Sequence, residues 1–280
     1  MGMVLIDWRS IGLVACLASL VVGDAAQAAD ATYPDLRGAW LRPDGAQWDF
    51  TKPPGLRQQA PLTPEYQRIF EANLADQKAG NQSYNSQARC YPSGMPRVMV
   101  AYYPLEFIVT PEATYVRSDH LNESRRIHTD GRSWPASIRP TFEGYSIGSW
   151  IDQDGDGHYD VLAVETRGMR GPRQFDASGL PLHADNQTVL KERIYVDRTE
   201  KNLLHNEITV IDHALTRPWT VMRNYRRMAK PVWVQDACGE SNNYVILGRE
   251  SYFLSGEGLL MPTRKDQPPP DLRYFTQASK

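Results

Sequence analysis

Glu192 is the residue whose position most directly suggests chemistry, because it stands in the middle of the segment TVLKERIYVD. Alternate side chains of an extended strand face opposite sides, so Glu192 shares a face with Leu190 and Ile194. A carboxylate between two aliphatic side chains must be hydrogen-bonded, paired with a cation or kept protonated. We therefore predict that Glu192 is either a catalytic acid–base group or a structural carboxylate paired with an inward arginine.

The following segment, NLLHNEITVID, has the same alternation. Leu204, Asn206 and Ile208 share one face, and we expect Asn206 and Asp212 to point inward and contact a ligand. Asp212 and His213 end this strand, and a simple turn is the alternative there because ALTRP follows.

Aromatic residues are plentiful, with 7 Trp and 14 Tyr in the chain. Most of these rings belong to a core, but a surplus of rings inside a barrel also suits a flat, apolar or aromatic ligand. We expect Trp150 and Trp219 to contribute such contacts.

The segment SRRIHTDGRSWP is dense in polar residues. Arg126 and His128 fall on one side of a strand, and an arginine beside a histidine binds an anionic group and supplies a proton. Tyr145 would join Arg126 in stabilising negative charge. His183, in the loop GLPLHADNQ, is a second acid–base candidate. The alternative for both histidines is an exposed, solvated position.

The run DQDGDGHYD, residues 152–160, has the acidic and glycine residues of a metal loop between two strands. An EF-hand is excluded, because position 12 of that template is Ala163 and strands replace its helices. The run is similar to the calcium loops of integrin-type propeller repeats and predicts a structural Ca²⁺. A polar hairpin tip is the alternative. The calcium ligands would be Asp152, Asp154, Asp156, Asp160 and the carbonyl of His158.

Several functional classes are excluded by composition and motif. The formal net charge of −2 offers no basic excess for nucleic acid. The chain contains no GxSxG, HExxH, P-loop or dinucleotide fingerprint, so we expect no organic cofactor. The six histidines are scattered without ligand spacing, which predicts no transition-metal site.

The elements that must position these residues are mostly strands. From Arg97 onward, short β-branched and aromatic runs alternate with turn residues, giving about eleven strands that suit an antiparallel barrel or sandwich. Thr63 and Pro64 begin one helix, with Tyr66 and Phe70 on its apolar face. Before that helix, a segment rich in Pro, Gly and aromatics predicts an extended arm.

The first 28 residues have the pattern of an export signal, ending in Ala26-Gln27-Ala28. Acylation of Cys16 in LVAC is the alternative, but its apolar run is short. Export predicts a periplasmic or secreted protein, in which Cys90 and Cys238 form a disulfide or remain two separate thiols. No later segment is apolar enough to span a membrane.

The motifs SGMPRVM, RRIHTDGR, PTFEGYSIGSWID, LAVETRG, HADNQTVLKERIY and EITVIDHALTRPWTV resemble a broad family of exported bacterial proteins of largely unassigned function. The resemblance covers residues 90–239 and implies an all-β, lipocalin-like antiparallel barrel. The expected organisation is a signal peptide at 1–28, an N-terminal arm and helix at 29–89, and the barrel at 90–280.

Two functions are consistent with these residues. The first is an exported, cofactor-independent lyase, hydratase or isomerase acting on a hydrophobic or aromatic small molecule, with Glu192, His128 or His183 moving protons. The second is a non-catalytic carrier or sensor for such a molecule, in which Glu192 and Arg126 pair or orient the ligand. The sequence leaves the oligomeric state open.

Overall fold

A computed structural model describes residues 32–269, apart from 44, 81–84, 86, 88–89, 101, 172, 235–237, 239–243, 248–249 and 256. The predicted signal peptide and Cys16 lie outside these residues. Among the helices of the described part, none has the length and apolar character needed to cross a membrane.

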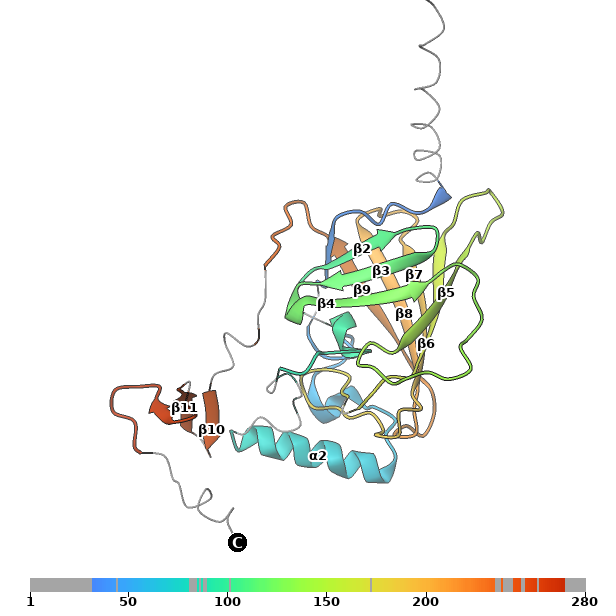
Figure 1. The fold of residues 1–280 in the computed structure, drawn as a ribbon. Coiled ribbons are helices and arrows are strands. Elements are labelled where there is room, and N and C mark those ends of the chain that lie inside the picture. The colour runs from blue at the N-terminus through green and yellow to red at the C-terminus, as the bar shows by residue number, and fades with distance from the viewer. Residues whose placement is uncertain are drawn as a thin grey trace, which may run out of the picture.

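Nine strands close into a barrel in sequence order (Figure 1). They are β1 (Ala39–Leu41), β2 (Leu105–Val109), β3 (Ala113–Ser118), β4 (Glu123–His128), β5 (Tyr145–Ile151), β6 (Val161–Arg167), β7 (Val189–Val196), β8 (Leu203–Ile211) and β9 (Trp219–Arg227). Short 3-10 turns occur at Gly55–Gln58, Arg97–Val100 and His120–Asn122.

The barrel is mixed, which corrects the prediction of a wholly antiparallel one. β4 and β5 pair in parallel, with Ile127 opposite Ser146, whereas the other pairs within the barrel are antiparallel. Parallel neighbours need a long crossover, because the chain must return to the end at which the first strand began. Residues 129–144 supply that crossover.

The inward faces of β7 and β8 agree with the alternation of the sequence. Leu190, Ile194, Leu204 and Ile208 are buried in the core, and Glu192 lies among them. Their outward neighbours are exposed or half-buried. The period of two therefore identified the inner face of both strands correctly.

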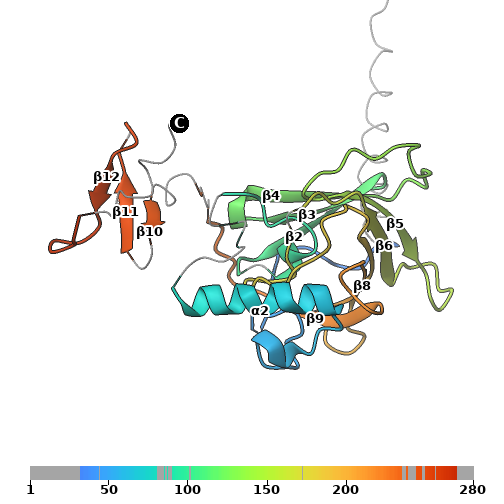
Figure 2. The same ribbon diagram turned by 90° about the horizontal axis from the view of Figure 1, so that it is seen from below.

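The α-helix α2 (Pro64–Lys78) lies across one end of the barrel (Figures 1 and 2). Thr63 caps it by accepting a hydrogen bond from Tyr66 N at 3.4 Å, and Pro64 occupies its first turn, as predicted. Tyr66 and Phe70 are buried. The arm before the helix is part of the barrel. Its strand β1 pairs with both β2 and β9 and so closes the barrel.

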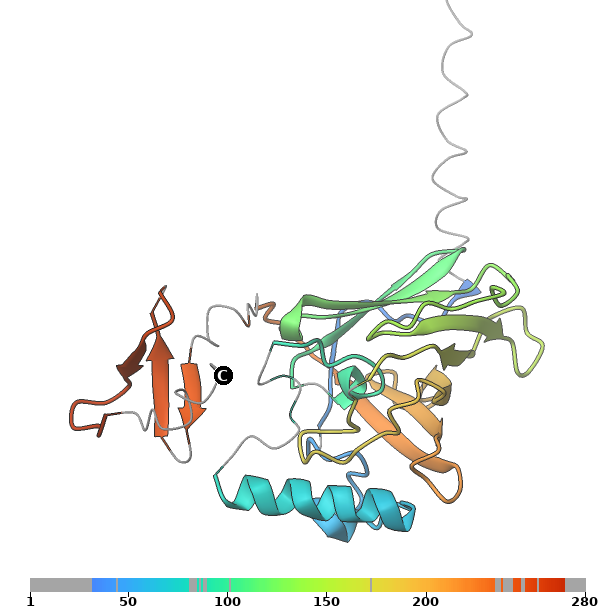
Figure 3. The ribbon, with the colours of Figure 1, turned by 60° about the horizontal axis from the view of Figure 1, so that its bottom comes forward.

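A second, three-stranded sheet lies to one side of the barrel (Figures 2 and 3). It contains β10 (Tyr244–Leu247), β11 (Glu250–Leu254) and β12 (Leu260–Pro262). These three strands lie within the range 90–280 expected for the barrel, but they form a sheet of their own. Since β9 pairs with β1, the closed barrel offers no edge to which β10 could add.

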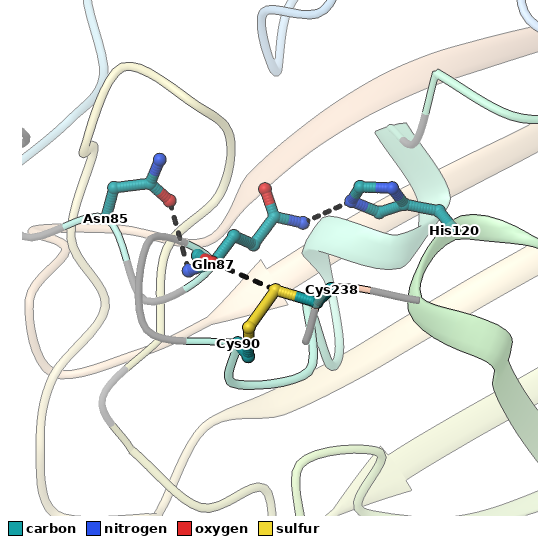
Figure 4. The surroundings of a disulfide bond; sticks show 5 residues. All are labelled: Asn85, Gln87, Cys90, His120 and Cys238. Atoms are coloured by element: carbon teal, nitrogen blue, oxygen red, sulfur yellow. Dashed lines mark hydrogen bonds between the residues drawn. A yellow bond between two sulfur atoms is a disulfide. The ribbon is translucent and has the colours of Figure 1, made fainter. Parts of the chain in front are cut away.

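A disulfide joins Cys90 to Cys238, with Cα atoms 5.5 Å apart (Figure 4). The predicted pairing is confirmed, and it is consistent with an oxidising compartment. Gln87 lies beside the bridge: its carbonyl oxygen is 3.8 Å from Cys238 Sγ, and its Nε2 is 2.6 Å from His120 Nε2. The bond ties the segment between α2 and β2 to the one that follows β9.

Candidate functional site

Glu192 on β7 meets Arg125 on β4 inside the barrel. Arg125 Nη1 donates to Glu192 Oε1 at 3.1 Å, and Nη2 donates to Oε2, which makes the contact bidentate. The side chains are 1% and 0% exposed, respectively. The sequence alternative of a carboxylate paired with an inward arginine is therefore what the structure contains.

Three more polar side chains complete this ion pair. Arg125 Nε donates to Ser146 Oγ at 3.2 Å, and Nη2 donates to Thr166 Oγ1 at 2.8 Å. Asn206 Nδ2 donates to Glu192 Oε1 at 2.9 Å, so the prediction that Asn206 points inward beside Glu192 is correct. Both carboxylate oxygens are engaged, which leaves Glu192 poorly placed to exchange a proton with a substrate.

The sequence analysis paired Glu192 with Arg126, but its partner in the structure is the preceding residue, Arg125. Arg126 is exposed, and its guanidinium lies over the outer ring of Tyr115, 5.1 Å from the centroid. The predicted pairing of Glu192 with Arg126 is thus corrected to Arg125. The sequence contained a signal for this inward position of Arg125. Ile127 is the apolar residue of the strand, and Arg125 lies on the same face as Ile127.

The carboxyl groups of Glu143 and Glu123 form a pair near Arg125. Glu123 accepts backbone hydrogen bonds from Ser93 and from Gly94, the latter at 3.0 Å. The buried Oε2 of Glu143 has no hydrogen-bond partner. Burial and the neighbouring Glu123 carboxylate raise the pKa of Glu143 to about 8, against a smaller opposing effect of Arg125. Burial and the Glu123 carboxylate thus favour the protonated form of Glu143.

The predicted residues His128 and Tyr145 lie on the outside of the barrel. Their rings are 5.0 Å apart, and Trp134 from the crossover lies 6.0 Å from Tyr145. Burial, together with the charge of Arg132, lowers the pKa of His128. The two side chains are thus close to one another but separated from Glu192 by the wall of the barrel.

Trp134 also forms one wall of a groove of about 440 Å³ on the outer face of β5–β8. Arg167 lies over the Trp134 ring at 4.4 Å. Apolar side chains of Ile147 and Ala163 line the groove beside charged ones. The charged residues that line it are Glu165, Lys191, Arg193 and Glu207, together with Glu192, whose side chain is buried inside the barrel.

The two predicted ligand-binding tryptophans belong to packed regions. Trp219 is 5% exposed and packs against Trp48 and Phe175 at centroid distances of 6.4 and 5.4 Å. Trp150 packs against Tyr33 at 5.3 Å. Trp219 thus belongs to the core and Trp150 is partly buried against it, and contact of either ring with a ligand stays a prediction.

Asp212 is buried and organises the loops at one end of β8. Its Oδ1 accepts from His183 N at 2.9 Å and from Ala214 N at 2.8 Å, and its Oδ2 accepts from Thr188 Oγ1. This arrangement brings the loop of His183 against the turn that contains His213. The ring centroids of the two histidines are 5.6 Å apart, with Asp185 between them.

The acidic loop is the hairpin tip between β5 and β6. Asp152 accepts from Gly155 N at 2.7 Å and from Gly157 N at 2.9 Å, and these bonds lower its pKa. Asp156 Oδ1 accepts from His158 N, and Asp160 Oδ2 accepts from Gln153 N. The carboxylates of Asp152, Asp154 and Asp156 each bring an oxygen within 4.8 Å of the others. Both predicted features, a hairpin tip and a carboxylate cluster, thus coexist, and the calcium ion stays a prediction.

The fold and these contacts define a mainly β protein with a closed, mixed nine-stranded barrel that surrounds a buried Arg–Glu pair. No family model matches the chain, and no curated protein is significantly similar to it.

Proposed function

We propose that this chain is an exported carrier or sensor that binds a flat, partly apolar small molecule in the groove beside Trp134. The observation that carries the proposal is the groove itself. Its volume of about 440 Å³ lies within the roughly 300–1,000 Å³ typical of small-molecule sites. The tryptophan ring offers a stacking surface, and the charged rim offers orienting contacts.

The charges around the groove favour a ligand with polar substituents over a plain hydrocarbon. Lys191 Nζ lies 3.9 Å from Glu165, and Arg193 lies opposite Glu207 in the register of β7 and β8. Each cation therefore has an acidic neighbour, so the rim is mixed and not strongly charged. An aromatic molecule with one polar or anionic substituent fits this combination. The predicted export signal and the disulfide support binding outside the cytoplasm.

A fluorescent aromatic anion, 1-anilinonaphthalene-8-sulfonate, tests the groove. We expect saturable binding that Trp134→Ala weakens by at least about tenfold, or about 1.4 kcal/mol. Trp233→Ala is the matched control, because Trp233 is 40% exposed and lies outside the groove. The assignment of the site is contradicted if both substitutions weaken binding equally, or if neither of them weakens it.

An acid–base enzyme is the second candidate, and Glu143 is the observation that favours it. A carboxyl group that is protonated at neutral pH is suited to donate a proton. Incubation with pooled aromatic and hydrophobic metabolites, followed by mass spectrometry, separates the two functions. Recovery of unchanged ligand supports the carrier, whereas conversion by the wild-type chain that Glu143→Gln abolishes supports the enzyme.

A further inference from the structure

His183, Asp185 and His213 bring three metal-ligating atoms to one place. Asp185 Oδ2 lies 3.1 Å from His183 Nδ1 and 2.5 Å from His213 Nδ1. The ligand atoms of the three residues all lie within 4.8 Å of one another. The histidine spacing of the sequence predicts no such cluster, because His183 and His213 belong to different loops.

We propose that these three residues form a binding site for a divalent transition-metal ion such as Zn²⁺. Two imidazole nitrogens and one carboxylate oxygen are the ligands that zinc, nickel and copper accept. Calcium and magnesium prefer oxygen ligands, so this site differs in kind from the acidic loop.

The distances are close to those that a bound ion requires. Ligand bonds of about 2.0–2.1 Å in a tetrahedral site place the ligand atoms about 3.3 Å apart. The separation between His183 and Asp185 is 3.1 Å, and the 2.5 Å contact of His213 must open by less than an ångström. The ligand nitrogens of the two histidines lie within 4.8 Å of one another. The exposed His213 side chain has the freedom to make that adjustment.

The surrounding contacts hold the ligands in position. Asp185 Oδ1 accepts from Gln187 N at 3.0 Å, which leaves Oδ2 directed to the two histidines. Tyr66 of α2 packs against the His183 ring at 5.2 Å, and Arg173 Nη2 donates to the His183 carbonyl at 3.0 Å. Such supporting contacts orient first-sphere ligands and raise metal affinity.

The site is open to solvent on one side. The His213 side chain is 69% exposed, and those of His183 and Asp185 are 32% and 26% exposed. Three protein ligands leave a fourth position of a tetrahedral ion for water or an external ligand, as in sites where zinc is catalytic. The proposal is independent of the Trp134 groove.

Calorimetric titration of the tag-free, metal-stripped chain with ZnCl₂ tests the site. We expect one saturable site, and His213→Gln and Asp185→Asn are expected to weaken it by at least about 100-fold. His158→Gln is the matched control, since it removes another exposed imidazole and should bind zinc as the wild type does. CoCl₂ should give visible d–d absorption in the wild type and lose it in His213→Gln.

Thermal melts provide a readout that does not depend on heat of binding. Zinc should raise the melting temperature of the wild type and of His158→Gln, but not that of His213→Gln. Because His213 is largely exposed, its substitution should leave the metal-free melt unchanged. The proposal is overturned if the wild type binds zinc no more tightly than about 1 mM. Equal affinity of the wild type and His213→Gln, or loss of binding in His158→Gln, overturns it as well.

Discussion

Arg125 and Glu192 meet in the barrel interior from strands that are three positions apart in the barrel, and each side chain satisfies the other through two hydrogen bonds. A buried charge without a partner is costly, so each residue requires the other. This pair therefore sets the register of the polar core that Ser146, Thr166 and Asn206 complete.

Removal of one partner should be strongly destabilising. We expect Arg125→Met to reduce the free energy of unfolding by about 3–5 kcal/mol, because the Glu192 carboxylate is left buried and unpaired. Urea denaturation measures this loss. Arg126→Met is the matched control and should stay within about 0.5 kcal/mol of the wild type, since that side chain is exposed. Similar losses in the two variants would contradict the inward assignment of Arg125.

Glu143 should make stability fall as the pH rises. Its pKa is raised from an ordinary 4.5 to about 8 in the folded chain, so between these values the folded state holds a proton that the unfolded state has released. The contribution of Glu143 to the free energy of unfolding is fully present below pH 4.5 and is lost as the pH rises through 8. The contribution of Glu143 to the slope of unfolding free energy approaches about 1.4 kcal/mol per pH unit.

Denaturation of wild type and Glu143→Gln across this pH window isolates that contribution. The glutamine variant keeps the shape of the side chain but does not titrate, so the fall in stability should be smaller in it. Identical pH profiles would show that Glu143 has an ordinary pKa.

Loss of the Cys90–Cys238 disulfide should destabilise the chain by about 2–5 kcal/mol, because the bond restricts the unfolded state over a long loop. The two cysteines are separated by 148 positions. Denaturation of the Cys90→Ser/Cys238→Ser variant measures the effect. Reductant should lower the stability of the wild type to that of the variant and leave the variant unchanged. A wild-type chain that is insensitive to reductant would contradict the prediction.

Calcium should stabilise the hairpin tip if its carboxylates bind the ion. At a Ca²⁺ concentration ten times the dissociation constant, the melting temperature should rise by about 3–5 °C. Asp154→Asn should remove this response, whereas Asp266→Asn, an exposed aspartate elsewhere, should retain it. A melt that chelator and added Ca²⁺ leave unchanged assigns the loop to turn geometry alone.

Local pattern was sufficient for the features that depend on neighbouring residues. The alternation in TVLKERIYVD and NLLHNEITVID placed Glu192 and Asn206 on the inner face, and Thr63 with Pro64 marked the start of α2. Period and capping are properties of a few consecutive residues, so the sequence alone carries them.

Other features of the fold and the site depended on pairing between residues that are distant in the chain. The contact of Arg125 with Glu192 depended on the closure of the barrel, and the parallel pairing of β4 with β5 depended on the path of the crossover. The closure of β9 on β1 excluded β10 from the barrel. His183 and His213 meet because Asp212 ties two loops together. Such contacts join residues that are distant in the chain, and no local period encodes them, so only the tertiary structure brings these groups together.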